Sequence, residues 1–119
     1  MKNDQNSKQY DLEQRTYEFA RKCRDYVKKL SKTISNIEYG KQLIRSSGSQ
    51  AANYIEANEA LSKKDFVHRI KISRKETKES ILWLKLAIPN AQDEKEKQEL
   101  IQEGTELMKI FGSIYQKSK

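Results

Sequence analysis

The sequence predicts an all-α protein, folded as an antiparallel up-down-up-down four-helix bundle. Apolar and small residues recur at steps of three and four along most of the chain, which is the spacing of one helical face. Glycine and proline, with 4 and 1 copies, are too few to supply the turns of a sheet. Breaks in the apolar spacing near residues 31–35, 62 and 89–90 divide the chain into four segments.

Length and composition narrow the class of protein. A chain of 119 residues corresponds to one domain. Hydrophobic residues make up 35% and charged residues 34%, so the regular spacing is what distinguishes the chain from a disordered one. Cys23 is the single cysteine, the polar start is unlike a signal peptide, and no apolar run approaches the roughly 20 residues that cross a bilayer. We therefore expect a cytoplasmic protein that does not enter membranes.

The first helix follows a polar lead. Residues 1–10 are expected to be flexible, and a single domain is expected over residues 11–117. Its first helix is predicted over residues 11–30, with Asp11 as the N-cap. The predicted core line of this helix is Leu12, Thr16, Phe19, Ala20, Cys23, Tyr26, Val27 and Leu30.

The second helix, predicted over residues 36–61 with Thr33 or Ser35 as its cap, has two distinct sides. One side spans roughly 60° on a wheel of 100° per residue and is the predicted core line: Ile37, Gly40, Ile44, Gly48, Ala51 and Ile55. The opposite side is uncharged and mostly small: Gln42, Ser46, Ser49, Asn53, Ala57 and Ala60. Because a surface helix normally turns charged residues to water, we expect another subunit to cover this side. The alternative is a helix well covered by its own bundle.

The third and fourth helices are predicted over residues 63–88 and 91–117. Ser62 caps the third, and Pro89 ends it. Acidic residues open the fourth helix and lysines close it, which suits the helix dipole. The predicted core line of the third is Phe66, Ile70, Ser73, Thr77, Ser80, Ile81, Leu84 and Ala87. That of the fourth is Leu100, Ile101, Gly104, Leu107, Met108, Phe111, Ile114 and Tyr115.

Charged and aromatic residues flank these core lines on the second and third helices. A weakly hydrated arginine needs a carboxylate, so Arg45 is expected to pair with Glu76 or Glu79. Such a pair more often sets helix register than carries chemistry. Ile72 and Trp83 beside it favour an apolar contact area over a ligand site. The predicted contact between subunits comprises Gln42, Arg45, Ser46, Ser49, Asn53, Glu56, Ala57, Ala60, Ile72, Glu76, Glu79 and Trp83.

Four segments together resemble a known family. They are DLEQRTYEFA (11–20), QLIRSSGSQAANYIEA (42–57), SKKDF (62–66) and ISRKETKESILWL (72–84). They resemble the small four-helix-bundle proteins encoded by intervening sequences within bacterial 23S ribosomal RNA genes. The fourth helix matches only in character. Ala57, where these proteins often carry glycine, and Ser73, where alanine is usual, are mild departures.

The resemblance implies a ring-shaped homopentamer of helical bundles. The chain is also similar to the accessory protein of diversity-generating retroelements, a basic pentamer that engages nucleic acid and a reverse transcriptase. Binding to RNA is what the genomic setting of the family implies. The residues themselves do not determine the number of subunits.

The third helix carries a basic stripe, which indicates a surface for phosphates. The net charge of the chain is +7, and cationic stripes attract nucleic acid without reading its sequence. The predicted nucleic-acid residues are Lys64, His68, Lys71, Lys75, Lys78 and Lys85, with Arg21, Arg24 and Lys28 of the first helix. The plain alternative is a solvated helix face, since lysine-rich helix backs are common. Repeated weak contacts in an oligomer would add avidity.

No pattern in the sequence predicts an enzyme, a metal site or a cofactor. His68 has no nearby histidine or cysteine, Cys23 lies on a core line, and no glycine-rich phosphate loop occurs. Glu76 and Glu79 lack the repeated Glu-x-x-His of di-iron bundles. The expected function is a non-catalytic homo-oligomeric scaffold that binds structured RNA or DNA. The alternative is a scaffold for protein–protein contacts, with an unidentified protein partner and no nucleic-acid role.

Overall fold

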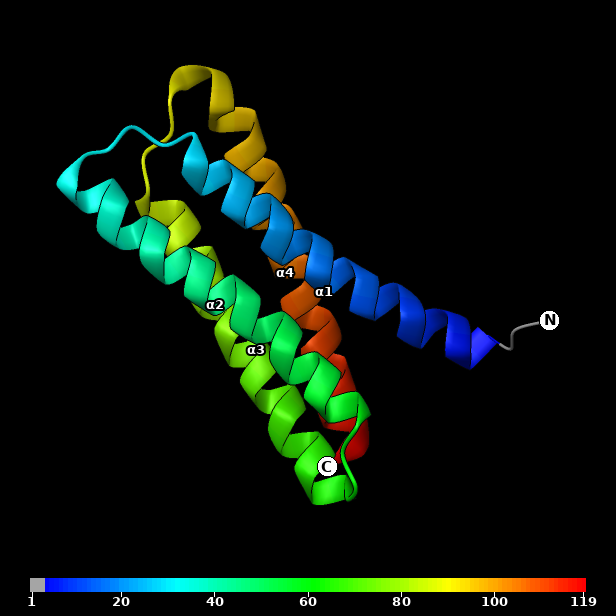
Figure 1. Ribbon diagram of the computed structural model, residues 1–119. Helices are drawn as coiled ribbons and strands as arrows, with labels where there is room; N and C mark the ends of the chain where they lie inside the picture. The colour runs from blue at the N-terminus through cyan, green and yellow to red at the C-terminus, as the bar shows by residue number, and fades with distance from the viewer. Residues whose placement is uncertain (1–3) are drawn as a thin grey trace.

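A computed structural model describes the backbone of residues 4–119 and the side chains of residues 12–119. Residues 4–119 contain no strand. Figure 1 shows the α1–α2 and α3–α4 links at one end of the molecule and the α2–α3 link at the other. The elements are α1 (Asp4–Lys28), α2 (Ile34–Asn58), α3 (Lys63–Leu86), the short 3-10 helix η1 (Ala91–Asp93) and α4 (Glu94–Ser118).

Capping side chains start α2 and α3, as predicted. Thr33 Oγ1 accepts a hydrogen bond from the Asn36 N–H at 3.1 Å, and Ser62 Oγ accepts one from the Asp65 N–H at 3.1 Å. The predicted N-cap at Asp11 is wrong, because α1 already begins at Asp4 and Asp11 lies inside the helix. The first three residues of the predicted flexible lead lie outside the described residues.

Three of the four predicted core lines are confirmed. In α1 the residues Leu12, Phe19, Cys23 and Tyr26 are buried, at the predicted steps of three and four. The predicted line of α3 is buried from Ile70 to Ala87, with Phe66 half-buried, and α4 contributes its own buried positions: Leu100, Gly104, Leu107 and Phe111.

The predicted core line of α2 is wrong, because the helix is rotated about its axis relative to that prediction. Ile37, Ile44 and Ile55 are 42%, 45% and 49% exposed, and Gly48 is exposed as well. Of the predicted line, only Gly40 and Ala51 are buried. The buried positions of α2 are Asn36, Gly40, Leu43, Ser46, Ser47, Gln50, Ala51, Tyr54 and Ala57.

Hydrogen bonds explain how α2 buries polar side chains and leaves isoleucines outside. Ser46 Oγ lies 2.7 Å from Ser80 Oγ, between α2 and α3. The Gln50 side-chain amide donates to the Thr16 carbonyl of α1 at 2.7 Å, and Ser73 Oγ donates to the Gln50 carbonyl at 3.0 Å. A buried polar group costs little once it is hydrogen-bonded. Polar residues therefore form the line by which α2 contacts both neighbouring helices, although Gln50 Oε1 has no hydrogen-bond partner among the described residues.

The packing order places α1 and α3 on a diagonal. α2 packs between α1 and α3, and α4 packs between α3 and α1. No Cα atom of α1 lies within 8 Å of a Cα atom of α3 in the described part of the chain. The outer faces of α1 and α3 therefore point to different sides of the molecule.

Candidate nucleic-acid interface

The basic stripe of α3 is a continuous, exposed line of cations. Lys64, Lys71, Lys78 and Lys85 follow one another at intervals of seven residues, close to two helical turns. At 1.5 Å per residue the line is ~31 Å long. His68 and Lys75 lie between these lysines, and all six side chains are exposed. The stripe predicted from the sequence is thus present as one surface.

The middle of the stripe borders an open hollow of about 500 Å³. Its lining includes His68, Lys71, Lys75 and Lys78, and also Arg74, which the sequence analysis did not single out. The signal for Arg74 was its position three residues after Lys71, which places the two side chains on adjacent parts of one face. A guanidinium beside several ammonium groups is well suited to phosphate oxygens, because it presents paired N–H donors.

The C-terminal turns of α4 extend this surface. The Lys71 ammonium lies 5.8 Å from the centre of the Tyr115 ring, and the Lys119 ammonium lies 5.6 Å from it. Such cation–π contacts hold lysines near an aromatic face without neutralising them. Tyr115 therefore orders two positive charges at the edge of the hollow.

The lysines of the stripe keep their charge uncompensated. Among the side chains of residues 12–119, none of its members makes an ion pair within 4.0 Å. A phosphate that approaches the stripe does not have to displace a carboxylate of the same chain. This is the property that a nonspecific nucleic-acid surface requires.

The three predicted cations of α1 are arranged differently, and they do not join the α3 stripe. The Arg21 guanidinium pairs with Glu18 at 2.6 Å and with Asp25 at 3.4 Å. Arg24 and Lys28 pair with the same Asp25, at 3.1 and 4.0 Å. The hydrogen bond from Arg21 lowers the pKa of Glu18, so that carboxylate stays charged beside it. The α1 cations therefore lie apart from the α3 stripe and, unlike the lysines of the stripe, they are paired with carboxylates.

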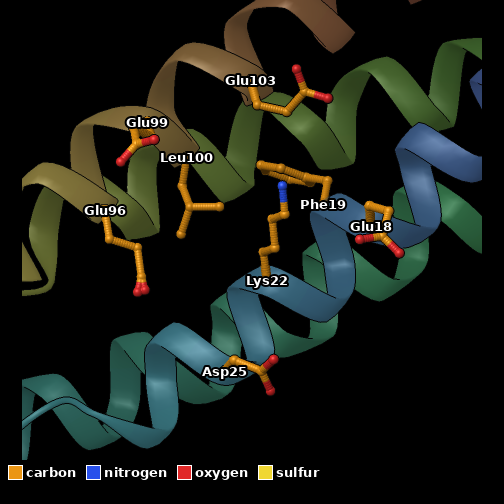
Figure 2. Close-up of a pocket in the computed structure, with 8 residues that line it drawn as sticks. All are labelled: Glu18, Phe19, Lys22, Asp25, Glu96, Glu99, Leu100 and Glu103. Atoms are coloured by element: carbon orange, nitrogen blue, oxygen red, sulfur yellow. The ribbon is translucent and has the colours of Figure 1, made fainter.

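An acidic cleft lies between α1 and α4. Figure 2 shows carboxylates on both walls, with the Lys22 amine pointing into the space between the helices beside Phe19. The cleft has a volume of about 560 Å³. Its carboxylates are Glu18, Asp25, Glu96, Glu99 and Glu103. Four of them already have cationic partners in the chain: Arg21 pairs with Glu18 and Asp25, Lys29 with Glu96, and Arg15 with Glu103. These cations around the cleft are therefore less available to phosphates than those of the α3 stripe.

The predicted subunit contact on α2 and α3 is only partly exposed. Ser46 and Ala57 are 0% and 2% exposed because they pack inside their own bundle, so their placement on an outer face is wrong. Gln42 and Glu56 are exposed, and Glu76 is buried. The remaining exposed and half-buried positions stay predictions for a contact: Arg45, Ser49, Asn53, Ala60, Ile72, Glu79 and Trp83.

The predicted Arg45 ion pairs are confirmed as contacts within one chain. Its guanidinium lies 3.1 Å from a Glu76 carboxylate oxygen and 3.4 Å from a Glu79 oxygen. Beside them the Trp83 ring stacks on Tyr39 with 6.0 Å between centres. These contacts join α2 to α3 and fix their register.

Among the described residues, the side chains of Cys23 and His68 lie in different parts of the molecule and do not form a common site. Burial raises the pKa of the Cys23 thiol to about 12, so the thiol stays protonated. His68 lies in the stripe among lysines. Within the described residues, no three histidine, cysteine, aspartate or glutamate side chains are placed to hold a metal ion. No helix in the described part of the chain is long and apolar enough to cross a membrane.

Comparison with known proteins identifies the family. The model of the 23S rRNA-intervening sequence protein family matches residues 8–113, which is most of the chain. The chain belongs to the 23S rRNA-intervening sequence protein family. Its helices, its α3 stripe and its hydrogen-bonded α2 line are therefore features of a member of this family.

A solved structure has the same fold as this 23S rRNA-intervening sequence protein. It is a protein of unknown function from the S23 ribosomal protein family of Bacteroides thetaiotaomicron. The two chains are 29% identical and superpose with a TM-score of 0.76, over 87% of this chain and 97% of the other. No curated protein sequence matches the chain.

Proposed function

We propose that this protein is a non-catalytic, homo-oligomeric helical scaffold that binds structured RNA or DNA nonspecifically through α3. The observation that carries the proposal is the line of uncompensated cations along α3, with Arg74 and the hollow at its centre. Nonspecific binding depends on phosphate neutralisation and needs no base-reading group. Membership of the 23S rRNA-intervening sequence protein family also supports RNA as the partner.

The proposed architecture is an antiparallel up-down-up-down bundle, repeated in a ring. The α1–α2 and α3–α4 links lie at one end of the molecule and the α2–α3 link at the other, which supports alternating helix directions (Figure 1). Large apolar side chains remain exposed in the single subunit, which supports self-association. They include Ile37, Ile44, Ile55, Leu82, Leu86 and Ile88. A ring of five, as the family resemblance implies, would bring five α3 stripes onto one particle and multiply weak contacts through avidity.

The test is charge reversal on α3. Lys71, Lys75 and Lys78 are exposed and unpaired within the described residues, so changing them to glutamate leaves the core intact. We expect the triple variant to lose binding to an rRNA fragment and to duplex DNA in a salt series. Helicity by circular dichroism and mass by light scattering should stay unchanged. Failure of the unmodified protein to bind either probe at low salt would contradict the proposal.

A second candidate function is a scaffold for protein–protein contacts alone, in a cytoplasmic complex. The exposed apolar residues favour it, because they form contact areas that phosphates do not use. On this alternative the lysines of α3 serve solubility. Self-association by light scattering without any nucleic-acid binding by the unmodified protein at low salt would favour this second function over the first. Unchanged binding in the α3 triple variant would instead place the nucleic acid on another surface.

A further inference from the structure

α2 exposes a row of apolar residues on the side that lies next to α1. Three of its isoleucines, Ile37, Ile44 and Ile55, are each between 42% and 49% exposed. Single exposed apolar residues are common on protein surfaces, but three on one line of one helix form a contact surface. Beside it, Val27 and Ile37 line a groove of about 490 Å³ between α1 and α2.

The spacing of this row is that of a coiled-coil seam. We name it the α2 seam and define it as Ile37, Lys41, Ile44, Gly48, Ala51 and Ile55, of which all but the buried Ala51 are exposed. Successive members lie alternately four and three residues apart, and each kind of position recurs after seven residues, which gives two members per heptad. A repeat of 3.5 residues keeps one line of a helix against a partner helix. The outside of α2 therefore has the periodicity of a surface that packs on another helix.

Gly48 lies at the centre of the α2 seam, and no contact inside its own subunit requires a glycine there. A Cβ atom added there would have no neighbour within 4 Å. The other three glycines differ, because a Cβ at Gly40, Gly104 or Gly112 would approach Val27, Ile81 or Arg74. Glycine weakens a helix relative to alanine, and its benefit is the close approach of another backbone. An approaching helix outside the subunit supplies that benefit at Gly48.

The charges along α2 are complementary to those of a second, oppositely directed α2. Lys41 lies seven residues before Gly48, and its ion partner is Glu38 at 4.0 Å. Glu56 and Glu59 lie in the turns after Gly48, and they make no ion pair among the side chains of residues 12–119. When two copies cross antiparallel at Gly48, each Lys41 enters the hole bordered by Ala52, Ile55, Glu56 and Glu59 of the other. A parallel pair would instead place Lys41 against Lys41.

We propose that the α2 seam is a contact between two copies of this chain, which cross antiparallel about a two-fold axis at Gly48. Such a contact is isologous, so each ion contact occurs twice. The inference rests on the proposed self-association and adds the surface and its symmetry. Within a ring of odd number, this contact joins one ring to a second ring.

Engineered cysteines test the symmetry directly. At a two-fold axis a residue meets its own equivalent, so Gly48→Cys should oxidise to a disulfide-linked dimer. A mixture of Ile44→Cys and Ala52→Cys chains should give mixed dimers, because these positions lie four residues before and after the crossing. If the new cysteine side chain at position 48 holds the two helices apart, the Ile44→Cys and Ala52→Cys chains can still form a disulfide with each other. Gln102→Cys, exposed on α4, is the matched control and should stay unlinked. Buried Cys23 does not interfere.

Charge exchange tests the pairing. Lys41→Glu or Glu59→Lys alone should raise the dissociation constant of the dimer by roughly five- to tenfold, and the two together should restore it. Restoration separates a contact across the axis from a loss of folding. The inference is overturned by the following combination of results. Light scattering still shows self-association, neither cysteine set forms a disulfide between chains, and the double charge exchange does not restore the dissociation constant. In that case the proposed scaffold stands and another surface makes the contact. Single subunits at every concentration would overturn both proposals.

Discussion

Asn36 links the two connections at one end of the molecule. Its side-chain amide donates to the Ser31 carbonyl at 3.0 Å and to the Ile88 carbonyl at 2.9 Å. Its side-chain oxygen accepts from the Ile88 N–H at 2.9 Å. The residue is 4% exposed, so water does not replace these partners. One side chain thus ties the α1–α2 link to the end of α3.

The single substitution Asn36→Ala should destabilise the fold strongly. Three hydrogen bonds disappear and backbone groups at Ile88 lose their partner, so we expect the free energy of unfolding to fall by ~2–3 kcal/mol. Urea denaturation followed by circular dichroism measures the change. Ser35→Ala, at the neighbouring exposed position, is the control and should stay within ~0.5 kcal/mol of the parent. Equal effects of the two substitutions would contradict the role assigned to Asn36.

At the scale of elements, glycines set how closely α4 approaches its neighbours. A Cβ on Gly104 would lie 3.0 Å from Ile81 Cγ1 and 3.3 Å from Phe19 Cζ, both buried side chains. A Cβ on Gly112, two turns later on the same helix, would lie 3.4 Å from Arg74 Nε, at an exposed and flexible side chain. The same residue type therefore has a packing role at one position and little packing constraint at the other.

Alanine substitutions at these two glycines should act in opposite directions. Gly104→Ala overfills the core between α1, α3 and α4, and we expect a loss of ~1–2 kcal/mol in the free energy of unfolding. Gly112→Ala removes a flexible residue from a helix at an ordinary contact distance and should gain ~0.5–1 kcal/mol. Thermal and urea unfolding measure both. A gain at Gly104 would mean that α4 does not approach α3 as closely as described.

On the scale of the whole molecule, charge is divided between two sides. The α3 stripe is uncompensated, whereas the cleft between α1 and α4 holds five carboxylates around Lys22. The cations of α1 are already paired with Glu18 and Asp25. A polyanion therefore meets unpaired cations on the α3 side, whereas Arg15, Arg21 and Lys29 around the cleft are already paired with carboxylates.

Salt dependence should show which side binds. Removing a lysine that neutralises one phosphate lowers, by ~1, the magnitude of the slope of log affinity against log salt concentration. We expect this from Lys75→Ala, equally for RNA and DNA probes of any sequence. Reversing Arg21, Arg24 and Lys28 together to glutamate, as a control on α1, should leave the slope unchanged. A reduced slope in the α1 variant would show that nucleic acid binds α1 as well.

Local patterns in the sequence determined most of the helices. Thr33 and Ser62 mark helix starts because their side chains satisfy free N–H groups, and α1, α3 and α4 bury apolar residues at helical steps. The α3 stripe was also predictable, since a spacing of seven residues keeps lysines on one face whatever the helix packs against. These features depend on residues close together in the chain.

Tertiary packing alone decided which side of α2 is buried. An apolar pattern selects Ile37, Ile44 and Ile55, yet the helix buries Ser46 and Gln50, because their hydrogen-bond partners are on α1 and α3. Packing order also separated the cations of α1 from those of α3. Such partners come from helices distant in the chain, so spacing within one helix does not reveal them. Which polar residues are satisfied inside, and which cations share a surface, depends on how the helices are arranged around one another.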